Sequence, residues 1–241
     1  ELGVDTDVDK DTNGDGDLDT DTLSDFDKDQ NALMAEFHFT DTGDPKRNFY
    51  LVAEKLAHEV QDKYGVPWQV CLAQACMESG YGHELGKTGR EGYVIFVIKG
   101  NGYTGDLVQS GTQEGAQGER REQASFRGYS SIRESFYGYG DFLQKSFPRA
   151  FAPEIHADPV LFLMALEADP HHKYAEDEQY VKKIETFWKT KKIDVGSTLP
   201  SSEAKPEDEG FFAKVGQFLS KMGASASDAF KKTYASIKAS I

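Results

Sequence analysis

Residues Pro67–Gly82 read PWQVCLAQACMESGYG, and the rest of the chain is organised around this stretch. Within residues 68–77, Gln69 and Gln74 are the only polar side chains in an otherwise apolar or small run. A helix with so few polar positions has no solvent-facing side, so it is expected to lie in a core. The sequence therefore predicts a buried central helix.

The ends of this helix are marked by its composition. Pro67 suits a first helical turn, where its missing N–H is not needed, and Gly80 and Gly82 suit the end of the helix. Cys71 and Cys76 lie five positions apart, about 140° around a helix axis, so they cannot form a disulfide within it. We expect two buried free thiols.

Glu78 lies in the last turn of the predicted helix. Burial disfavours the charged form of a carboxyl group and raises its pKa. A carboxyl that keeps its proton near neutral pH can serve as a general acid. Taken alone, Glu78 fits this role as well as it fits that of a structural glutamate paired at a helix end.

The segment AQACMESGYG resembles the catalytic helix of lysozyme-like peptidoglycan hydrolases, specifically the glucosaminidases of glycoside hydrolase family 73. That family carries a Q-A-x-x-E-S-G-W-G pattern whose glutamate is the catalytic acid. The matching residues are Gln74, Ala75, Glu78, Ser79, Gly80 and Gly82, with Tyr81 in place of the tryptophan. The resemblance implies that Glu78 is the catalytic acid.

Three further segments resemble motifs of the same family and follow in the same order. The family's N-N-x-F-G-I-K-G corresponds to residues 93–100, F-R-x-Y to 126–129 and Y-A-T-D-x-x-Y to 174–180. In the first motif, Tyr93 and Val94 replace the two asparagines and Val97 replaces the glycine, which puts the geometry of the sugar cleft in question. The resemblance implies that the substrate is bound by Tyr81, Phe96, Lys99, Tyr129 and Tyr174.

Glycoside hydrolysis commonly uses a second carboxyl group, which activates water or attacks the sugar. Thr112 and Glu114 match the T-x-E of the family's mobile β-lobe, which makes Glu114 the candidate for this role. Glu119 and Glu122 are neighbouring alternatives. Taken singly, each of the three glutamates also fits a solvated loop residue.

The charge of the chain is concentrated at its beginning. Residues 1–44 hold fifteen acidic residues and two lysines, a net of −13 out of −14 for all 241 residues. The remainder is close to neutral and shows no basic patch, which argues against nucleic-acid binding.

Aspartates at alternate positions in residues 1–44 are typical of loops that bind Ca²⁺ through oxygen ligands. One register has Gly16 at its turn and Thr22 where a bidentate acid is expected; a second has Gln30 in place of the turn glycine. We expect a calcium-binding arm, with a solvated acidic tail as the alternative. The candidate ligands are Asp11, Asn13, Asp15, Asp17 and Asp19 in the first register, and Asp25, Asp27, Asp29 and Glu36 in the second.

Hydrophobic periodicity predicts the remaining elements of residues 45–195. We expect helices over 49–64, from Ser131, from the Asp158-Pro159 pair and around Tyr180, all with apolar stripes. The apolar run 93–98 predicts a strand, and the polar, glycine-rich 111–126 predicts a hairpin or lobe. The predicted fold class is mainly α (α+β), a lysozyme-like domain with a small β-lobe.

Residues 196–210 have the composition of a linker, and residues 211–241 form a basic amphipathic segment. Such a segment docks on a protein partner or on its own domain, or lies on a membrane. We favour docking over membrane contact. The predicted organisation is an acidic arm over 1–44, the glucosaminidase-type domain over 45–195, the linker and this tail.

Together these features predict an endo-N-acetylglucosaminidase that cleaves β-1,4 bonds of peptidoglycan and needs no cofactor for catalysis. The expected site of action is the cell wall, the periplasm or the extracellular space. The arm and the tail fit a phage virion or tail-associated lysin, and a cellular autolysin is the other context. The alternatives are a lytic transglycosylase, a muramidase, or a non-catalytic lysozyme-like module that binds glycan or supports an assembly.

Overall fold

The structure, a computed structural model, describes residues 23–114, 120–153, 155–167, 169, 174–175, 177 and 179–195, without the side chains of 110–114 and 120–123. The first calcium register, the linker, the tail and Glu119 lie outside the described residues.

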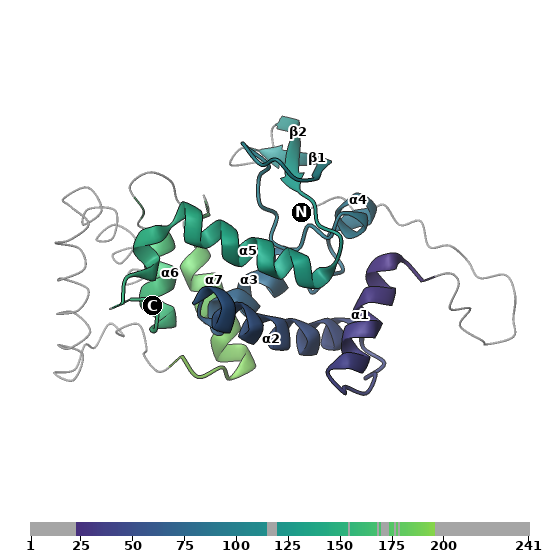
Figure 1. Cartoon of the computed structure of the whole chain (residues 1–241), viewed down its shortest axis with the longest axis horizontal. Helices are drawn as coiled ribbons and strands as arrows, with labels where there is room; N and C mark the ends of the chain where they lie inside the picture. Colours follow the sequence, from purple (N-terminus) through teal and green to yellow (C-terminus); the bar gives the residue numbers. More distant parts are fainter. Residues whose placement is uncertain are drawn as a thin grey trace, which may run out of the picture. The chain divides into compact units, whose positions relative to one another are not determined.

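The described part of the chain is mainly helical with one small antiparallel sheet, which confirms the predicted mainly α class with a small β-lobe (Figure 1). The helices are α1 (Asp25–Glu36), α2 (Pro45–Tyr64), α3 (Trp68–Glu78), α4 (Gly86–Glu91), α5 (Ile132–Ser146), the 3₁₀ helix η2 (Pro148–Phe151), α6 (Pro159–Glu167) and α7 (Tyr180–Lys191). The strands are β1 (Leu107–Glu114) and β2 (Arg120–Arg127).

The chain divides into two compact units, and each is described by itself. The first takes the chain up to Val52 together with Cys76–Phe136; the second takes Ala53–Ala75 together with the chain from Tyr137 onward. The divisions fall within α2, within α3 and within α5.

Helix α2 begins at Pro45, four residues before the predicted start at Phe49. The Asp44 carboxylate accepts hydrogen bonds from the backbone N–H groups of Lys46 (3.0 Å) and Arg47 (3.3 Å), which caps the helix. The predicted apolar stripe is confirmed, because Val52, Leu56 and Val60 are fully buried.

Helix α3 is the predicted central helix. Val70 to Cys76 are fully buried without a break, and both cysteines are free thiols, as expected. The one amide in this run, Gln74, accepts a hydrogen bond from the hydroxyl of Tyr139 on α5, also fully buried. The helix therefore serves as a core element in both of the units that share it.

Residues 25–36, the second calcium register, form helix α1 in the structure, where the sequence suggests a metal-binding loop. Ser24 caps the helix by accepting the Asp27 N–H at 3.2 Å, and acidic residues in a first turn are favoured by the helix dipole. In the described part of the chain no group of three or more His, Cys, Asp or Glu is placed to hold a metal ion.

Helix α1 also packs within the first unit, although it lies in the segment predicted as an arm. Phe26, Leu33 and Met34 are buried. Phe26 stacks on Phe49 of α2 and on Tyr93, with ring centroids 6.3 and 5.8 Å apart. The acidic residues at the start of the chain therefore include a helix that belongs to a core.

The prediction of a strand over 93–98 is wrong. These residues form turns, with a hydrogen bond from the Val94 N–H to the Gly89 carbonyl (2.9 Å), and both Tyr93 and Val97 have positive φ angles. Side chains from Tyr93 to Phe96 are nevertheless buried. A folded loop buries this apolar run as effectively as a strand would.

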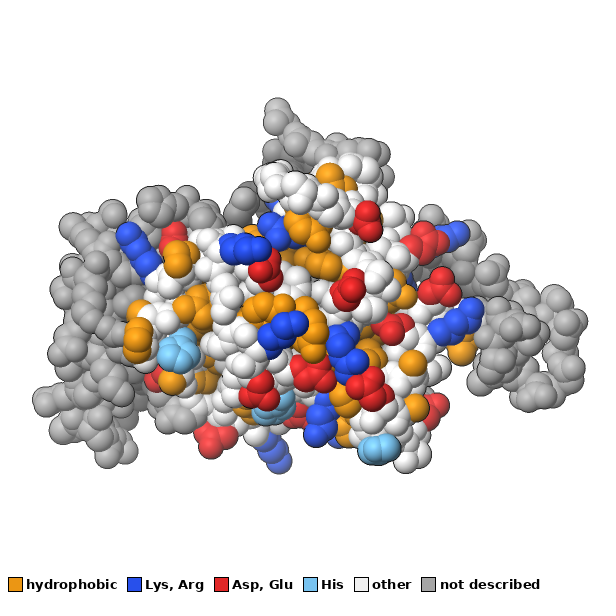
Figure 2. Space-filling view, in the orientation of Figure 1, with side chains coloured by type: hydrophobic (Ala, Val, Ile, Leu, Met, Phe, Trp, Pro, Cys, Tyr) orange, Lys and Arg blue, Asp and Glu red, His pale blue; other side chains and the backbone are white. Residues whose placement is uncertain are grey.

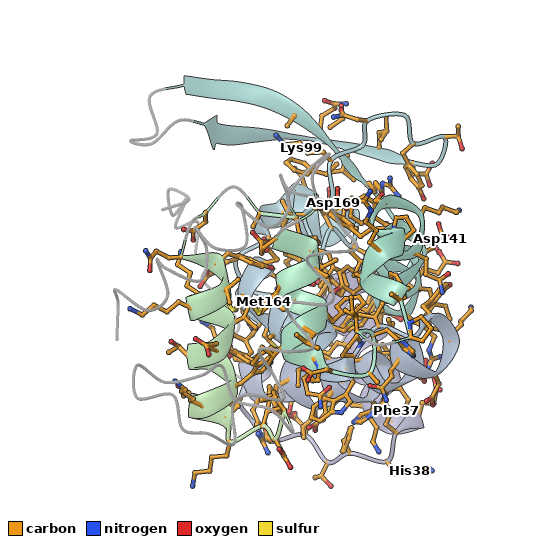
Figure 3. All side chains as sticks on the ribbon, turned by 90° about the vertical axis from the view of Figure 1, so that its left-hand side faces the viewer. Phe37, His38, Lys99, Asp141, Met164 and Asp169 are labelled. Atoms are coloured by element: carbon orange, nitrogen blue, oxygen red, sulfur yellow. The ribbon has the colours of Figure 1, made fainter. Side chains whose placement is uncertain are left out.

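The predicted hairpin is confirmed as β1 and β2, with β1 starting at Leu107. The register pairs Leu107 with Arg127, Thr112 with Glu122 and Glu114 with Arg120. The segment around Lys99 adds a single bridge to Phe126 of β2, and Figure 3 shows Lys99 beside this sheet.

The predicted helix starts and stripes of the remaining helices are confirmed. Asp158 caps α6 by accepting the N–H groups of Val160 (3.0 Å) and Leu161 (3.1 Å), and the Ser131 hydroxyl accepts the Glu134 N–H at 3.1 Å before α5. The core residues of α5 and α7 are buried as expected: Ile132, Phe136, Tyr139, Leu143, Tyr180, Ile184 and Phe187.

Acidic and basic side chains are interspersed over the visible face of the described residues (Figure 2), in keeping with the near-neutral charge calculated beyond residue 44. Among the described helices, none combines the length and the apolar character needed to cross a membrane.

Candidate active site

Glu78 is the last residue of α3 and lies in the first unit. Its side chain is half-buried, whereas residues 70–76 of the same helix are fully buried.

A tight turn directly follows Glu78. The Tyr81 N–H donates to the Cys76 carbonyl at 2.9 Å, the bond that closes a Schellman helix end, and the Gly82 N–H donates to the buried Ser79 hydroxyl at 2.8 Å. Gly80, Tyr81 and Gly82 have φ angles of 55°, 61° and 78°. A tyrosine in this left-handed region is strained, and such strain is found at functional sites.

Gly82 lies in close contact with aromatic rings from α1 and α2. A Cβ atom at this position would come within 2.9 Å of the Phe49 ring and 3.1 Å of the Phe26 ring. Glycine therefore meets two requirements here, the positive φ and the lack of space.

Arg90 of α4 connects the turn to α1. Its guanidinium donates to the Gly82 carbonyl at 3.4 Å and to the Ser24 hydroxyl at 3.3 Å, and it forms an ion pair with Asp27. The guanidinium carbon lies 4.8 Å from the centroid of the Phe26 ring. These contacts fix the carbonyl of the residue that ends the turn.

His83 follows the turn directly. Its pKa lies below the usual value, first because of burial and then because of the positive charges of Arg90 and Lys46. The imidazole therefore stays neutral to lower pH than an ordinary histidine does.

The loop that ends at Lys99 and Gly100 is joined to β2 through its backbone. The Gly100 N–H donates to the Ser125 carbonyl at 2.7 Å, and the Arg127 N–H donates to the Ile98 carbonyl at 2.9 Å. The Lys99 side chain is exposed.

Phe96 occupies a different environment from the one predicted. It is only 4% exposed and packs edge-on against Phe136 of α5, with ring centroids 5.0 Å apart. The structure places Phe96 in the core, where it has almost no surface to offer a sugar.

Tyr129 lies in the first unit and is half-buried. Its N–H donates to the Gly92 carbonyl at 3.0 Å, and its ring centroid lies 6.4 Å from that of Tyr103. The Arg127 guanidinium lies 4.7 Å from the centroid of the Tyr103 ring. The motif at 126–129 therefore presents aromatic surface at the base of the hairpin.

The backbone of Glu114 lies at the end of β1, opposite Arg120, and that of Glu122 lies opposite Thr112 on β2. The first unit thus holds Glu78, Tyr81, Lys99 and Tyr129 together with the hairpin that carries Glu114.

Tyr174 belongs to the second unit, where it is half-buried. Its ring centroid lies 6.3 Å from that of Phe147 and 5.8 Å from that of Tyr180, and its N–H donates to the Leu166 carbonyl at 3.3 Å. Tyr174 is therefore supported by the end of α6 and by the start of α7.

Sequence reasoning missed two features of this region. Arg90 carried no signal, because its partners are distant in the sequence. The positive φ angles of Tyr93 and Val97 did have a signal, since they fall where the family motif has asparagine and glycine, the residues that tolerate this conformation best.

Solved structures similar to this chain include the C-terminally truncated glycoside hydrolase domain of Salmonella typhimurium FlgJ, with 28% identity and a TM-score of 0.47, covering 63% of this chain and 99% of that one. A peptidoglycan hydrolase mutant from Sphingomonas sp. A1 has 30% identity and a TM-score of 0.46, covering 56% of this chain and 88% of that one.

Curated relatives include proteins named peptidoglycan hydrolase FlgJ. The one from Pseudomonas aeruginosa is 32% identical over 133 residues, which cover 54% of this chain and 32% of the relative. The one from Escherichia coli K12 is 30% identical over 159 residues, covering 64% of this chain and 49% of the relative. The chain therefore matches 32% and 49% of the length of these two relatives.

The family model described as "Glucosaminidase: Mannosyl-glycoprotein endo-beta-N-acetylglucosaminidase" matches residues 54–192, which is more than half of the chain. This range contains the α3 helix with Glu78, the hairpin and the motifs at 93–100, 126–129 and 174–180. The chain belongs to the glucosaminidase family.

Proposed function

We propose that this protein is a peptidoglycan hydrolase that cleaves β-1,4 glycosidic bonds of the glycan strand as an endo-N-acetylglucosaminidase. The observation that carries the proposal is the half-buried Glu78 at the end of the buried helix α3, followed by the strained turn 80–82. The family described as an endo-beta-N-acetylglucosaminidase and the relatives named peptidoglycan hydrolases support it.

In this proposal Glu78 protonates the oxygen of the leaving sugar. Glu114, carried by the hairpin, activates water or stabilises the positive charge that develops on the sugar ring. Tyr81, Lys99, Tyr129 and Tyr174 bind the glycan strand through their aromatic faces and polar ends. Phe96 supports the loop from inside the core.

The alternatives of a lytic transglycosylase, a muramidase and a non-catalytic module remain distinct outcomes of one experiment. The replaced asparagine and glycine of the 93–100 motif favour a non-catalytic module. However, Tyr93 and Val97 hold the left-handed backbone that asparagine and glycine adopt readily, with φ angles of 50° and 48°. A backbone shape that suits the family's asparagine and glycine favours the enzyme.

The test is digestion of purified peptidoglycan by the native protein and by Glu78→Gln, followed by mass spectrometry of the fragments. Glu84→Gln is the matched control, because Glu84 is an exposed carboxylate close in sequence to the same turn. We expect Glu78→Gln to lower the rate by at least about a thousandfold, since the reaction loses its proton donor, while Glu84→Gln stays active.

The products distinguish the reactions. Reducing-end GlcNAc supports the glucosaminidase, reducing-end MurNAc indicates a muramidase and anhydro-MurNAc indicates a transglycosylase. Fragment release that is equal for the native protein and Glu78→Gln would remove Glu78 from the mechanism. If the native protein releases no fragments, the protein is a non-catalytic module that binds glycan or supports an assembly.

The second carboxyl group is tested by Glu114→Gln beside Glu119→Gln and Glu122→Gln. We expect the large loss of rate at Glu114 alone. A loss of rate confined to the Glu119 or the Glu122 variant would assign the role of second carboxyl group to that residue.

The proposed site of action is the cell wall, in the periplasm or the extracellular space, since relatives are named for hydrolysis of peptidoglycan. We retain docking of residues 211–241 on a virion or envelope protein as a hypothesis. Cosedimentation of the full chain with cell walls, and separately with lipid vesicles, compared with a chain that ends at residue 210, tests it against membrane contact.

A further inference from the structure

We propose that Asp27 of α1 and Arg90 of α4 are positioning residues for the turn that follows Glu78, so that α1 forms part of the catalytic unit. The proposal rests on the proposed function for its effect on activity. Its structural part, that this pair holds the turn 80–82, stands independently of activity.

The first argument is the contact set of Arg90. One side of its guanidinium donates to the Gly82 carbonyl, and the other side contacts Asp27 and Ser24 at the start of α1. The pair is partly buried, with the Arg90 side chain 20% exposed and that of Asp27 36% exposed. A pair screened in this way from solvent holds its geometry better than a fully exposed pair does.

The second argument is the packing of Phe26. Its ring is 2% exposed, lies under the Arg90 guanidinium and stands beside the Cα of Gly82. Gly82 is therefore held through its carbonyl by Arg90 and through its Cα by Phe26 and Phe49. Residues 80–82 all have positive φ, and backbone of this kind persists only where its surroundings hold it.

The third argument is the place of α1 in the chain. The family match begins at residue 54, whereas α1 spans Asp25–Glu36. Helix α1 is also tied to the start of α5, since Asp29 in its second turn accepts the Ile132 N–H at 2.7 Å and its last residue, Glu36, pairs with Arg133 at 2.6 Å. A helix outside the matched range is thus anchored at two points and reaches the turn that carries the candidate acid.

The physical consequence is specific to Asp27. The bond from Arg90 to the Gly82 carbonyl is long at 3.4 Å, so its strength depends on how well the guanidinium is held in place. Without the Asp27 charge, Arg90 loses its ionic partner in α1. The turn is then free to relax from its strained form, which displaces Glu78 and Tyr81.

The experiment compares Asp27→Asn with Asp25→Asn in the full chain. Both substitutions remove one negative charge from the first turn of α1, but Asp25 is exposed and contacts only Lys28, at 3.6 Å, among the ion pairs of the described residues. The first measurement is amide hydrogen exchange at Tyr81, Gly82 and Glu84. We expect exchange at these amides to accelerate about tenfold in Asp27→Asn and to stay unchanged in Asp25→Asn.

The second measurement is kcat and KM on soluble glycan fragments, well below the unfolding temperature. We expect Asp27→Asn to lower kcat about tenfold with little change in KM, because the acid is misplaced while the glycan surface remains. Asp27→Glu, which keeps the charge, is expected to recover most of the lost rate.

Equal exchange in both variants would overturn the proposal, whatever the activity shows. Faster exchange in Asp27→Asn with kcat unchanged would show that the Asp27–Arg90 pair only stabilises the turn, and it would overturn the positioning role. A native protein with no hydrolase activity would defeat the proposed function instead, while the exchange experiment would still decide whether the pair holds the turn.

Discussion

Val97 shows most clearly, at the scale of single residues, how the chain departs from the motif of its family. It has a φ of 48° where the family motif has glycine, and its side chain is 37% exposed. A β-branched residue with positive φ is a strained outlier. Because the Val97 side chain is this exposed, its burial stabilises the fold little and does not offset the backbone strain.

We therefore expect Val97→Gly to raise the free energy of unfolding by about 1 kcal/mol, because the relief of strain exceeds the larger entropy that glycine has in the unfolded chain. Urea unfolding measures it. Val94→Gly is the control from the same loop: Val94 is buried and is not among the positive-φ residues, so that change should destabilise. Equal destabilisation by both would show that Val97 is not strained.

Among the elements, α1 changes the boundary between the acidic arm and the folded domain. Its buried side chains Phe26, Leu33 and Met34 belong to the first unit, while its acidic side chains pair with Arg90 and Arg133. An acidic helix is stable here because its apolar side packs and its charges find partners.

Removal of residues 1–36 is expected to lower the free energy of unfolding by about 3 kcal/mol or more, because it takes three buried apolar side chains out of the core and uncovers the Phe49 and Tyr93 rings on which Phe26 stacks. Removal of residues 1–22 alone keeps α1 and should leave stability within about 0.5 kcal/mol. Urea unfolding of the two shortened chains measures this difference. Equal stability of the two shortened chains would show that α1 does not stabilise the folded domain and belongs to the acidic arm.

At the scale of the whole molecule, most of the net negative charge lies in residues 1–44, ahead of the segment that matches the glucosaminidase family. Three acidic residues predicted as calcium ligands, Asp27, Asp29 and Glu36, have protein partners in α4 and α5. The calcium hypothesis therefore depends on the first register, Asp11 to Asp19, which lies outside the described residues.

We expect the full chain to bind Ca²⁺ with a dissociation constant of about 10⁻³ M or tighter, and the chain without residues 1–22 not to bind it. Isothermal titration calorimetry measures this, with Mg²⁺ as the comparison ion and Asp15→Asn/Asp17→Asn as the point variant. Indistinguishable titrations of the full and shortened chains would contradict the first register as the site.

The sequence by itself determined the central helix, its termination at Gly80 and Gly82, the two free thiols, the hairpin and the caps at Asp158 and Ser131. It also determined the position of Glu78 and the family. These features depend on residues within a few positions of one another, because helix periodicity, capping and turns are local interactions.

Only the tertiary structure decided that residues 25–36 are a helix, that 93–98 is a buried loop, and that Phe96 lies in the core. It also decided that Arg90 links α1 to Gly82. Asp27 and Arg90 are 63 positions apart, and Asp29 and Ile132 are 103 apart. Alternate aspartates or an apolar run fit several local conformations equally well, and the choice among them depends on partners that only the folded chain brings within reach.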